Sequence, residues 1–138
     1  EILPKNKPRY LMGVGTPADL VRNVARGVDM FDCVMPTRNA RNGQLFTFDG
    51  KINIRNAKFK FDYGPIDKNN ISLMSEKYSK AYLHHLFKTE EILGYRIATQ
   101  HNLKFYIHIM EKMQENIKLG NFKNWSQNFL DRYENSQL

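Results

Sequence analysis

The chain has 138 residues, with 21 Lys and Arg side chains against 14 Asp and Glu, so its formal net charge is +7. This length suits one domain, and the single cysteine, Cys33, excludes a disulfide framework or any site that needs several cysteine ligands. No apolar run approaches the roughly 20 residues that span a bilayer, and the N-terminus has neither a Met nor an apolar signal core, which is typical of a cut end.

The first predicted unit is a strand followed by a helix. Residues 9–12 form a short apolar run that ends at a Gly-Val-Gly turn, which predicts a strand. Thr16 then suits a helix cap, Pro17 the first helical position, and Asp19 the first turn, where a carboxylate meets free N–H groups. Gly27 is a suitable stop for this helix.

A second strand is predicted over residues 30–36, an apolar run that is too short for a helix and is closed by Pro36. A polar, basic loop over residues 37–43 follows it. The order strand, helix, strand is that of a βαβ unit, which implies that the two strands pair in parallel.

A β-hairpin is predicted next. Residues 45–48 and 51–55 flank Asp-Gly, the favoured dipeptide of a tight turn. Two isoleucines alternate with polar residues in the second of these runs, so one face of the hairpin is expected to contact water.

The rest of the chain is predicted to be a loop and then helices. Residues 62–77 are polar and rich in turn formers, which favours a loop or an irregular subdomain. From Tyr78 the apolar spacing is helical to the end, with breaks expected at Gly94 and Gly120.

Asp32 is the sharpest candidate for chemistry. It lies in the middle of an apolar predicted strand, where a carboxylate is costly to bury unless it is hydrogen-bonded or used. In parallel α/β sheets, functional sites form at the carboxyl ends of strands. The pattern therefore allows two interpretations, a functional aspartate or a structural one bonded to neighbouring backbone.

Basic side chains gather after this strand and across the hairpin. Arginine forks suit phosphates and base edges, and nearby aromatic rings can stack on bases, although a solvated basic face and ordinary hairpin packing explain the same residues. The basic residues are Arg38, Arg41, Lys51, Arg55, Lys58 and Lys60. The aromatic residues are Phe46, Phe48, Phe59, Phe61 and Tyr63.

Two other patterns are weak signals for ligands. Residues 13–16 place two glycines before a helix N-terminus, which suits an anion but is more often a simple turn. The four histidines have no cysteine near them and read as ordinary helix residues rather than as metal ligands. They are His84, His85, His101 and His108.

Five segments in order along the chain closely resemble the bacterial tRNA-guanine transglycosylase (queuine tRNA-ribosyltransferase) family. They are residues 9–15, 26–43, 54–58, 78–86 and 91–94. The resemblance implies an α/β fold, the C-terminal portion of a (β/α)₈ TIM-type barrel with an inserted β-hairpin and a helical C-terminal region. It also implies a cytoplasmic glycosyltransferase (pentosyltransferase) of queuosine biosynthesis. Such an enzyme exchanges the wobble guanine of tRNA for a 7-deazaguanine queuine precursor through a covalent aspartyl-ribose intermediate.

The resemblance also assigns roles to residues of this chain. Asp32 matches the nucleophile, and Met12 and Gly13 match the residues against which the base packs. The segments that contact tRNA match Gly13, Val14, Gly15, Thr16, Pro17, Ala18, Asp19, Thr37, Arg38, Asn39, Ala40 and Arg41. The implied partners are the tRNA anticodon loop, the 7-deazaguanine base and a second copy in a homodimer, with no membrane.

Length is the first departure from the family, because a barrel of this kind needs about 250 residues. The chain is expected to be incomplete, with the last barrel βα units in 1–43, the hairpin in 44–63, a degenerate zinc-type loop in 64–77 and the helical region in 78–138. Two parallel strands would leave unpaired edges, so the chain is expected to be unstable alone or to need the missing N-terminal part. The alternatives are a non-catalytic tRNA-binding or scaffold subunit, or a decayed remnant of the enzyme.

The zinc site is the second departure. The family has C-x-C-x-x-C before Tyr78, but the corresponding positions here hold Asn70, Ser72 and Ser75, while His101 keeps the histidine position. Without thiolates a tetrahedral structural zinc is not expected, and no other cofactor is expected.

Overall fold

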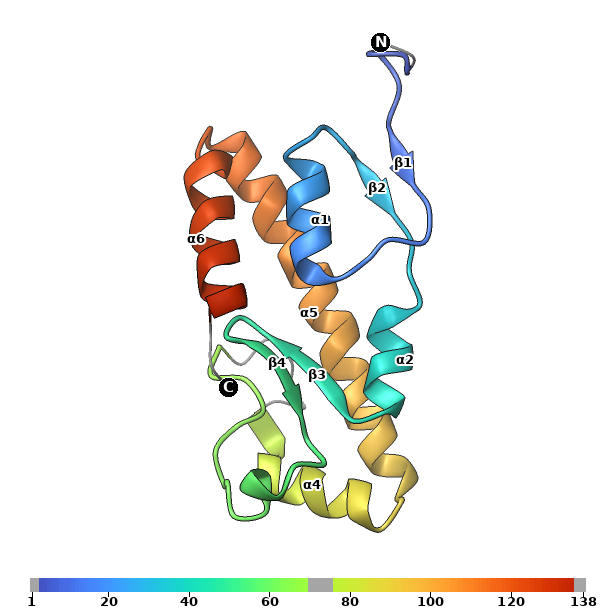
Figure 1. The fold of residues 1–138 in the computed structure, drawn as a ribbon, viewed down its shortest axis with the longest axis vertical. Coiled ribbons are helices and arrows are strands. Elements are labelled where there is room, and N and C mark those ends of the chain that lie inside the picture. Colours follow the sequence, from blue (N-terminus) through green and yellow to red (C-terminus); the bar gives the residue numbers. More distant parts are fainter. Residues whose placement is uncertain (1–2, 70–75, 136–138) are drawn as a thin grey trace.

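The computed structural model describes residues 3–69 and 76–135 (Figure 1). In chain order the elements are β1 (Tyr10–Leu11), α1 (Pro17–Val24), β2 (Met30–Phe31), α2 (Met35–Arg41), β3 (Gln44–Thr47), β4 (Gly50–Asn53), the short 3-10 helix η1 (Ala57–Phe59), α4 (Lys80–Lys88), α5 (Ile92–Lys118) and α6 (Phe122–Asn135). Strands β1 and β2 pair in parallel, and β3 and β4 pair antiparallel. This is a mixed α/β fold, and within the described ranges no helix is long and apolar enough to cross a membrane.

Helix α5 is the element that connects the rest. It contacts α1, α2, β3, α4 and α6, and Figure 1 shows it running the length of the molecule between them. Two cores form along it. One joins the hairpin, α4 and the first half of α5 around residues such as Leu45, Leu83 and Ile97. The other joins α1, α6 and the second half of α5 around Val21 and Phe105. The predicted four-segment division stays a prediction, since both cores draw on several of its segments.

The βαβ unit and its helix start are confirmed. Tyr10 is in register with Met30 on the parallel partner strand. Thr16 caps α1 and accepts a hydrogen bond from the Asp19 N–H at 3.2 Å, while the Asp19 carboxylate accepts bonds from the Thr16 N–H at 2.9 Å and hydroxyl at 2.6 Å. Pro17 occupies the first turn. This capping box fixes the angle at which α1 leaves the loop after β1.

Two predictions about the segment after β2 were wrong. The second strand ends at Phe31 rather than at Pro36, and residues predicted as a basic loop form α2 (Met35–Arg41). The reason is Pro36, which occupies the first turn of the helix, where its missing N–H costs nothing, instead of closing a strand. Asp32 therefore lies just beyond the strand and not in its middle.

The hairpin is confirmed, with its turn one residue earlier than predicted. Thr47 is in register with Gly50, so the turn residues are Phe48 and Asp49. The Thr47 hydroxyl donates to the Gly50 carbonyl at 2.9 Å and accepts from the Asp49 N–H at 3.1 Å. These two hydrogen bonds hold the two-residue turn. Ile52 and Ile54 are buried, and Lys51 and Asn53, which alternate with them, are exposed, as the alternation predicted.

The helices after Tyr78 are confirmed, but only one of the two glycine breaks is. Gly120 has φ +67° and separates α5 from α6. Gly94 lies inside α5 instead, where a Cβ atom would come 3.0 Å from the Leu86 Cβ. This glycine allows α4 and α5 to approach closely and does not end a helix.

The outer edge of β3 is bonded by side chains of α5. Asn102 accepts from the Phe46 N–H at 3.1 Å, and His101 Nε2 lies 2.7 Å from the Phe46 carbonyl oxygen. Asn102 also donates to the carbonyls of Pro36 at 2.9 Å and Gln44 at 3.0 Å. Both α5 residues are fully buried, so this polar cluster fixes the position of α2 and the hairpin against α5.

Candidate active site

The candidate active site lies on the open face of the β1–β2 pair. Side chains alternate along a strand, and β1 and β2 are in register, so Tyr10, Met12, Met30 and Asp32 are expected on one face. All four are exposed, Tyr10 by 52%, Met12 by 73% and Met30 by 47%. The described residues thus leave this face of the sheet uncovered.

The Asp32 carboxylate is held through one of its two oxygens. The Tyr10 hydroxyl donates to Oδ1 at 2.6 Å, and the Gly13 N–H donates to the same oxygen at 3.0 Å. Among residues 3–69 and 76–135, Tyr10 and Gly13 are the other residues that donate to this carboxylate, and both donate to Oδ1. The geometry therefore orients the carboxylate and leaves one oxygen available for chemistry.

The hydrogen bonds from Tyr10 and Gly13 also favour the charged form of the Asp32 carboxyl group. The Tyr10 hydrogen bond, with a smaller contribution from the Gly13 N–H, lowers the pKa of Asp32, because both donors favour the ionised form. The same bond raises the pKa of Tyr10, which therefore remains a neutral donor. Asp32 is a carboxylate at neutral pH, as a nucleophile requires.

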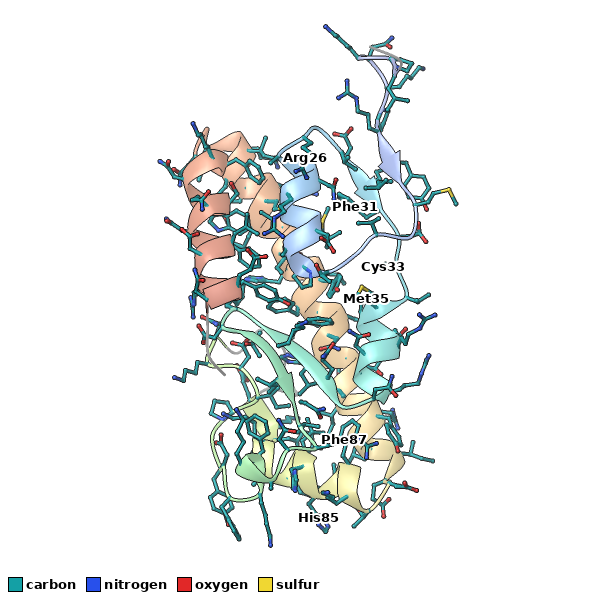
Figure 2. All side chains as sticks on the ribbon, viewed as in Figure 1. Arg26, Phe31, Cys33, Met35, His85 and Phe87 are labelled. Carbon is teal, nitrogen blue, oxygen red and sulfur yellow. The ribbon has the colours of Figure 1, made fainter. Side chains whose placement is uncertain are left out.

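The opposite side of the same segment faces the helices. Figure 2 labels Phe31, Cys33 and Met35 along the chain that joins β2 to α2. The Gly15 carbonyl accepts hydrogen bonds from the Tyr106 hydroxyl at 3.0 Å and the Cys33 thiol at 3.6 Å, which ties the loop after β1 to α5. A hollow of about 330 Å³ remains between this segment and α5, lined by residues that include Phe31, Asp32, Cys33, Tyr106, Ile107 and Met110.

The structure divides the predicted RNA-contacting residues into exposed and structural ones. Gly13, Arg38 and Arg41 are exposed, whereas Gly15, Pro17, Ala18 and Ala40 are buried. Thr16 and Asp19 form the capping box, and Val14 is half-buried. The Thr37 hydroxyl donates to the Val34 carbonyl at 3.1 Å, and the Asn39 amide donates to Gln44 Oε1 at 2.7 Å. Their contact with RNA stays a prediction.

The basic and aromatic residues of the hairpin region do not form one surface. Lys51, Lys58 and Lys60 are exposed, but Arg55 lies 5.2 Å from the centre of the Phe87 ring and donates to the Phe87 carbonyl at 3.4 Å. Phe46 and Phe59 are buried, Phe48 is half-buried, and Phe61 and Tyr63 are exposed. Packing around the hairpin accounts for the rings of Phe46, Phe48 and Phe59.

The histidines are dispersed. His84 Nδ1 lies 2.7 Å from the Ile54 carbonyl oxygen, His85 is exposed, and His108 lies 3.7 Å from Glu111. Burial lowers the pKa of His101, so its imidazole is neutral and Nε2 donates to Phe46. Asn70, Ser72 and Ser75 lie outside the described residues. Among those described, no group of three or more His, Cys, Asp or Glu residues could hold a metal ion.

Tyr10 is the site residue that sequence reasoning missed. Its signal was present: in a parallel pair with period-two alternation, a tyrosine two residues before Met12 faces the same side as the aspartate. Strand β1 was interpreted only as an apolar run that leads into a glycine turn, so this polar partner was overlooked.

The fold is that of an α/β protein, a class in which functional side chains often lie at the carboxyl ends of parallel strands. Here the carboxylate of Asp32, oriented by two hydrogen bonds and ionised, lies just beyond the end of β2. The chain belongs to the queuine tRNA-ribosyltransferase family, whose model matches residues 1–135.

Curated relatives agree with this assignment. The queuine tRNA-ribosyltransferase of Neisseria meningitidis serogroup C is 57% identical over 128 residues, which cover 93% of this chain and 34% of that relative. The queuine tRNA-ribosyltransferase of Francisella tularensis subsp. novicida is 54% identical over 132 residues, covering 96% of this chain and 36% of that relative. The chain thus spans about a third of the length of the curated relatives it matches.

Proposed function

We propose that this chain forms the nucleophile-bearing part of a tRNA-guanine transglycosylase, which exchanges the wobble guanine of tRNA for a 7-deazaguanine precursor of queuine. The observation that carries the proposal is the Asp32 carboxylate, which Tyr10 and Gly13 hold through Oδ1 while no other residue of the described ranges donates to Oδ2. Membership of the queuine tRNA-ribosyltransferase family supports the exchange reaction. The exposed position of Asp32, just beyond β2, supports its role as the nucleophile.

The proposed reaction is a double displacement at the ribose C1′ of the wobble nucleotide. Asp32 Oδ2 attacks C1′, and the bond from C1′ to guanine N9 breaks, with its electron pair and then a proton going to the departing base. The incoming 7-deazaguanine gives up its N9 proton and attacks C1′, which releases the aspartate. Two displacements retain the configuration at C1′, as in retaining glycosidases.

The same site offers surfaces for the base and the RNA. Met12 is exposed near Asp32 and presents a flexible, polarisable thioether side chain that suits packing against a planar base. Gly13, the next residue, brings its backbone close to the proposed position of the base. Arg38 and Arg41 lie in the last turn of α2, the next element after Asp32, and their exposure supports a role in holding phosphates or splayed bases of the anticodon loop.

The proposed architecture is part of a closed (β/α)₈ barrel. Strands β1 and β2 pair only with each other among the described residues, and one face of the pair is open. A barrel would complete both edges and would enclose that face. We further propose a homodimer in the cytoplasm, where tRNA is the substrate.

Incorporation of labelled guanine into tRNA tests the function. The complete enzyme is this chain joined to the two thirds of the Neisseria relative that it does not cover. We expect the label to enter the wobble position of tRNA, because guanine can replace itself in an exchange reaction. If no label enters, the proposed activity is wrong.

We propose that the chain does not hold the family's zinc. The donors at the three cysteine positions are one amide and two hydroxyls, all neutral, and the retained His101 already uses Nε2 at Phe46. These groups do not fit a tetrahedral thiolate site. Elemental analysis of the purified chain is expected to find far less than one zinc per molecule, and stoichiometric zinc would refute this.

Replacing Tyr10 with phenylalanine should alter the pH profile of base exchange. Tyr10→Phe removes the main donor that lowers the pKa of Asp32, so that pKa should rise and more of the carboxylate should be protonated at low pH. We expect the acid limb of the kcat profile to move to higher pH and kcat to fall by about 10- to 100-fold. Tyr63→Phe, at an exposed tyrosine far from Asp32 in sequence, is the control; an unmoved acid limb in Tyr10→Phe would show that Tyr10 is merely structural.

Removing the charges of Arg38 and Arg41 should weaken tRNA binding more than it affects folding. Both side chains are exposed on α2, so Arg38→Ala/Arg41→Ala is expected to change stability by no more than about 0.5 kcal/mol. Two lost phosphate contacts should weaken tRNA about 10- to 100-fold and reduce the salt dependence of log K by about 1.5. Filter binding at several salt concentrations measures both, with Lys118→Ala/Lys123→Ala as a charge-matched control. Unchanged affinity would exclude the RNA contact.

A further inference from the structure

The carbonyl oxygen of Gly15 joins three parts of the molecule. It accepts a hydrogen bond from the Tyr106 hydroxyl of α5 at 3.0 Å and another from the Cys33 thiol at 3.6 Å. Gly15 is buried in the loop after β1, and Cys33 follows Asp32 in the segment after β2. This one carbonyl therefore connects both segments of the candidate active site to α5.

The two segments are bonded a second time, at the Asp32 carboxylate. The Gly13 N–H donates to Asp32 Oδ1 at 3.0 Å. Two hydrogen bonds and two short stretches of backbone thus form a closed circuit, which we call the Gly15 clamp: Gly13, Gly15, Asp32 and Cys33. A single residue separates the two glycines, and each residue has only two soft backbone dihedrals, so a movement of the Gly15 carbonyl also displaces the Gly13 N–H from Asp32.

Tyr106 holds the Gly15 clamp from an element that is distant in sequence. Its hydroxyl bonds a carbonyl 91 residues earlier, and its side chain is buried. Its aromatic ring meets the Phe46 ring edge-on, with the ring centres 5.3 Å apart. Burial raises the pKa of Tyr106, so the hydroxyl keeps its proton and donates it to the hydrogen bond. Close packing around the aromatic ring gives this donor a fixed position.

A purely structural interpretation of this bond is that a buried tyrosine needs a partner for its hydroxyl. Tyr133 of α6 provides the comparison, because Tyr106 and Tyr133 are both 8% exposed and belong to the same core. The Tyr133 hydroxyl has no hydrogen-bond partner in the part of the chain that the structure describes. Burial in this core therefore does not by itself explain the bond from Tyr106 to Gly15.

We propose that Tyr106 is a positioning residue for the nucleophile: through the Gly15 carbonyl it holds the loop after β1 where the Gly13 N–H donates to Asp32. The same loop begins with Met12 and Gly13, the residues proposed to pack against the base. One hydrogen bond from α5 therefore aligns the nucleophile with the surface for the base. The inference rests on the proposed function of Asp32.

Tyr106→Phe tests the positioning role in the complete enzyme, this chain joined to the two thirds of the Neisseria relative that it does not cover. We expect kcat for guanine exchange to fall about 10- to 100-fold and the KM for guanine to rise, because the nucleophile and the base surface lose their alignment. The KM for tRNA should stay unchanged, since Arg38 and Arg41 lie on α2. The acid limb of the kcat profile should move to higher pH, because the Gly13 N–H contributes to lowering the pKa of Asp32.

Two further variants accompany this substitution. Tyr133→Phe is the matched control, because it removes the same hydroxyl from an equally buried tyrosine, and it should keep kcat within about twofold and leave the acid limb in place. Cys33→Ala removes the other donor to Gly15. A thiol is a weak donor, so this variant should move the acid limb in the same direction as Tyr106→Phe but by less.

Amide hydrogen exchange gives a readout that does not depend on activity. Mass spectrometry with fragmentation that resolves single residues follows the Gly13 amide in the complete enzyme. In Tyr106→Phe this amide should exchange at least about tenfold faster, because its bond to Asp32 opens more often. The amides of α6 should keep their exchange rates, which shows that the variant is folded, and Tyr133→Phe should not change the Gly13 rate.

Three results separate this inference from the proposed function. An unchanged Gly13 rate in Tyr106→Phe overturns the inference, and so does a faster rate with kcat, KM and the acid limb unaltered, since Tyr106 would then be merely structural. If Tyr106→Phe also loses the slow exchange of α6, Cys33→Ala decides by the same two measurements. A complete enzyme that exchanges no guanine, while the Gly13 amide responds as expected, counts against the proposed function alone.

Discussion

Asp32→Asn is expected to abolish base exchange, lowering kcat by at least about 10⁴-fold, because the amide cannot form the ester bond to ribose. Asparagine has the same shape, and its Oδ1 can still accept the Tyr10 and Gly13 hydrogen bonds that hold the native side chain. The substitution therefore removes the proposed nucleophile while it leaves the local geometry in place. Incorporation of labelled guanine into tRNA by the complete enzyme measures the loss.

A covalent adduct gives this experiment a second readout. The enzyme with Asp32 should form an RNA–protein product that survives denaturing electrophoresis, and Asp32→Asn should form none. Asp29→Asn is the matched control, since Asp29 lies three residues earlier and bonds the Arg9 N–H at 2.8 Å. We expect that control to exchange guanine within about tenfold of the unaltered rate. An Asp32→Asn enzyme that still exchanges at the normal rate would remove Asp32 from the mechanism.

Asn102→Ala is expected to cause the largest loss of stability, about 3–5 kcal/mol. The Asn102 side chain makes two buried hydrogen bonds and one partly buried one, and its loss leaves the Phe46 N–H and the carbonyls of Pro36 and Gln44 without these bonds. Buried polar groups that lose their partners incur their desolvation cost. Urea unfolding of the chain, followed by the fluorescence of Trp125, its single tryptophan, measures the shift in midpoint.

Two further variants show whether the effect belongs to this hydrogen-bond cluster. Asn128→Ala changes an exposed asparagine of α6 and should shift stability by no more than about 0.5 kcal/mol. Asn102→Asp keeps the acceptor for the Phe46 N–H but sets a carboxylate oxygen against two carbonyls, so it should be at least as destabilising as alanine. If Asn102→Ala unfolds at the same urea concentration as the unaltered chain, the cluster does not hold α2 and the hairpin.

Local chemistry explains what could be predicted from the sequence. The capping box of Thr16 and Asp19 involves residues three apart. The hairpin follows from a short turn and alternation, and the parallel pairing follows from the order strand, helix, strand. Asp32 was identified because a carboxylate in the middle of an apolar strand is costly to bury unless it is bonded or used. That premise was wrong, because Asp32 lies just beyond β2 and is exposed. Such signals need no knowledge of the rest of the fold.

The errors concern features that depend on distant residues. Helix α2 was predicted as a loop, and its position depends on Asn102, whose amide bonds the Pro36 carbonyl from 66 residues away. Gly94 was interpreted as a break because its purpose, the close approach of Leu86, is visible only in three dimensions. The bond from Tyr10 to Asp32 spans 22 residues, and alternation predicts the shared face but not the contact.

The two sheets differ in how their edges meet solvent, and this affects aggregation. At Phe46, β3 has its N–H and carbonyl bonded by Asn102 and His101, so that edge offers no template there for a strand of another molecule. The β1–β2 pair has no such protection among the described residues, and it also exposes Tyr10, Met12 and Met30. Self-association of the separate chain should therefore begin at β1–β2 rather than at the hairpin. A strand that paired with a free edge of β1–β2 would keep the chain from aggregating there.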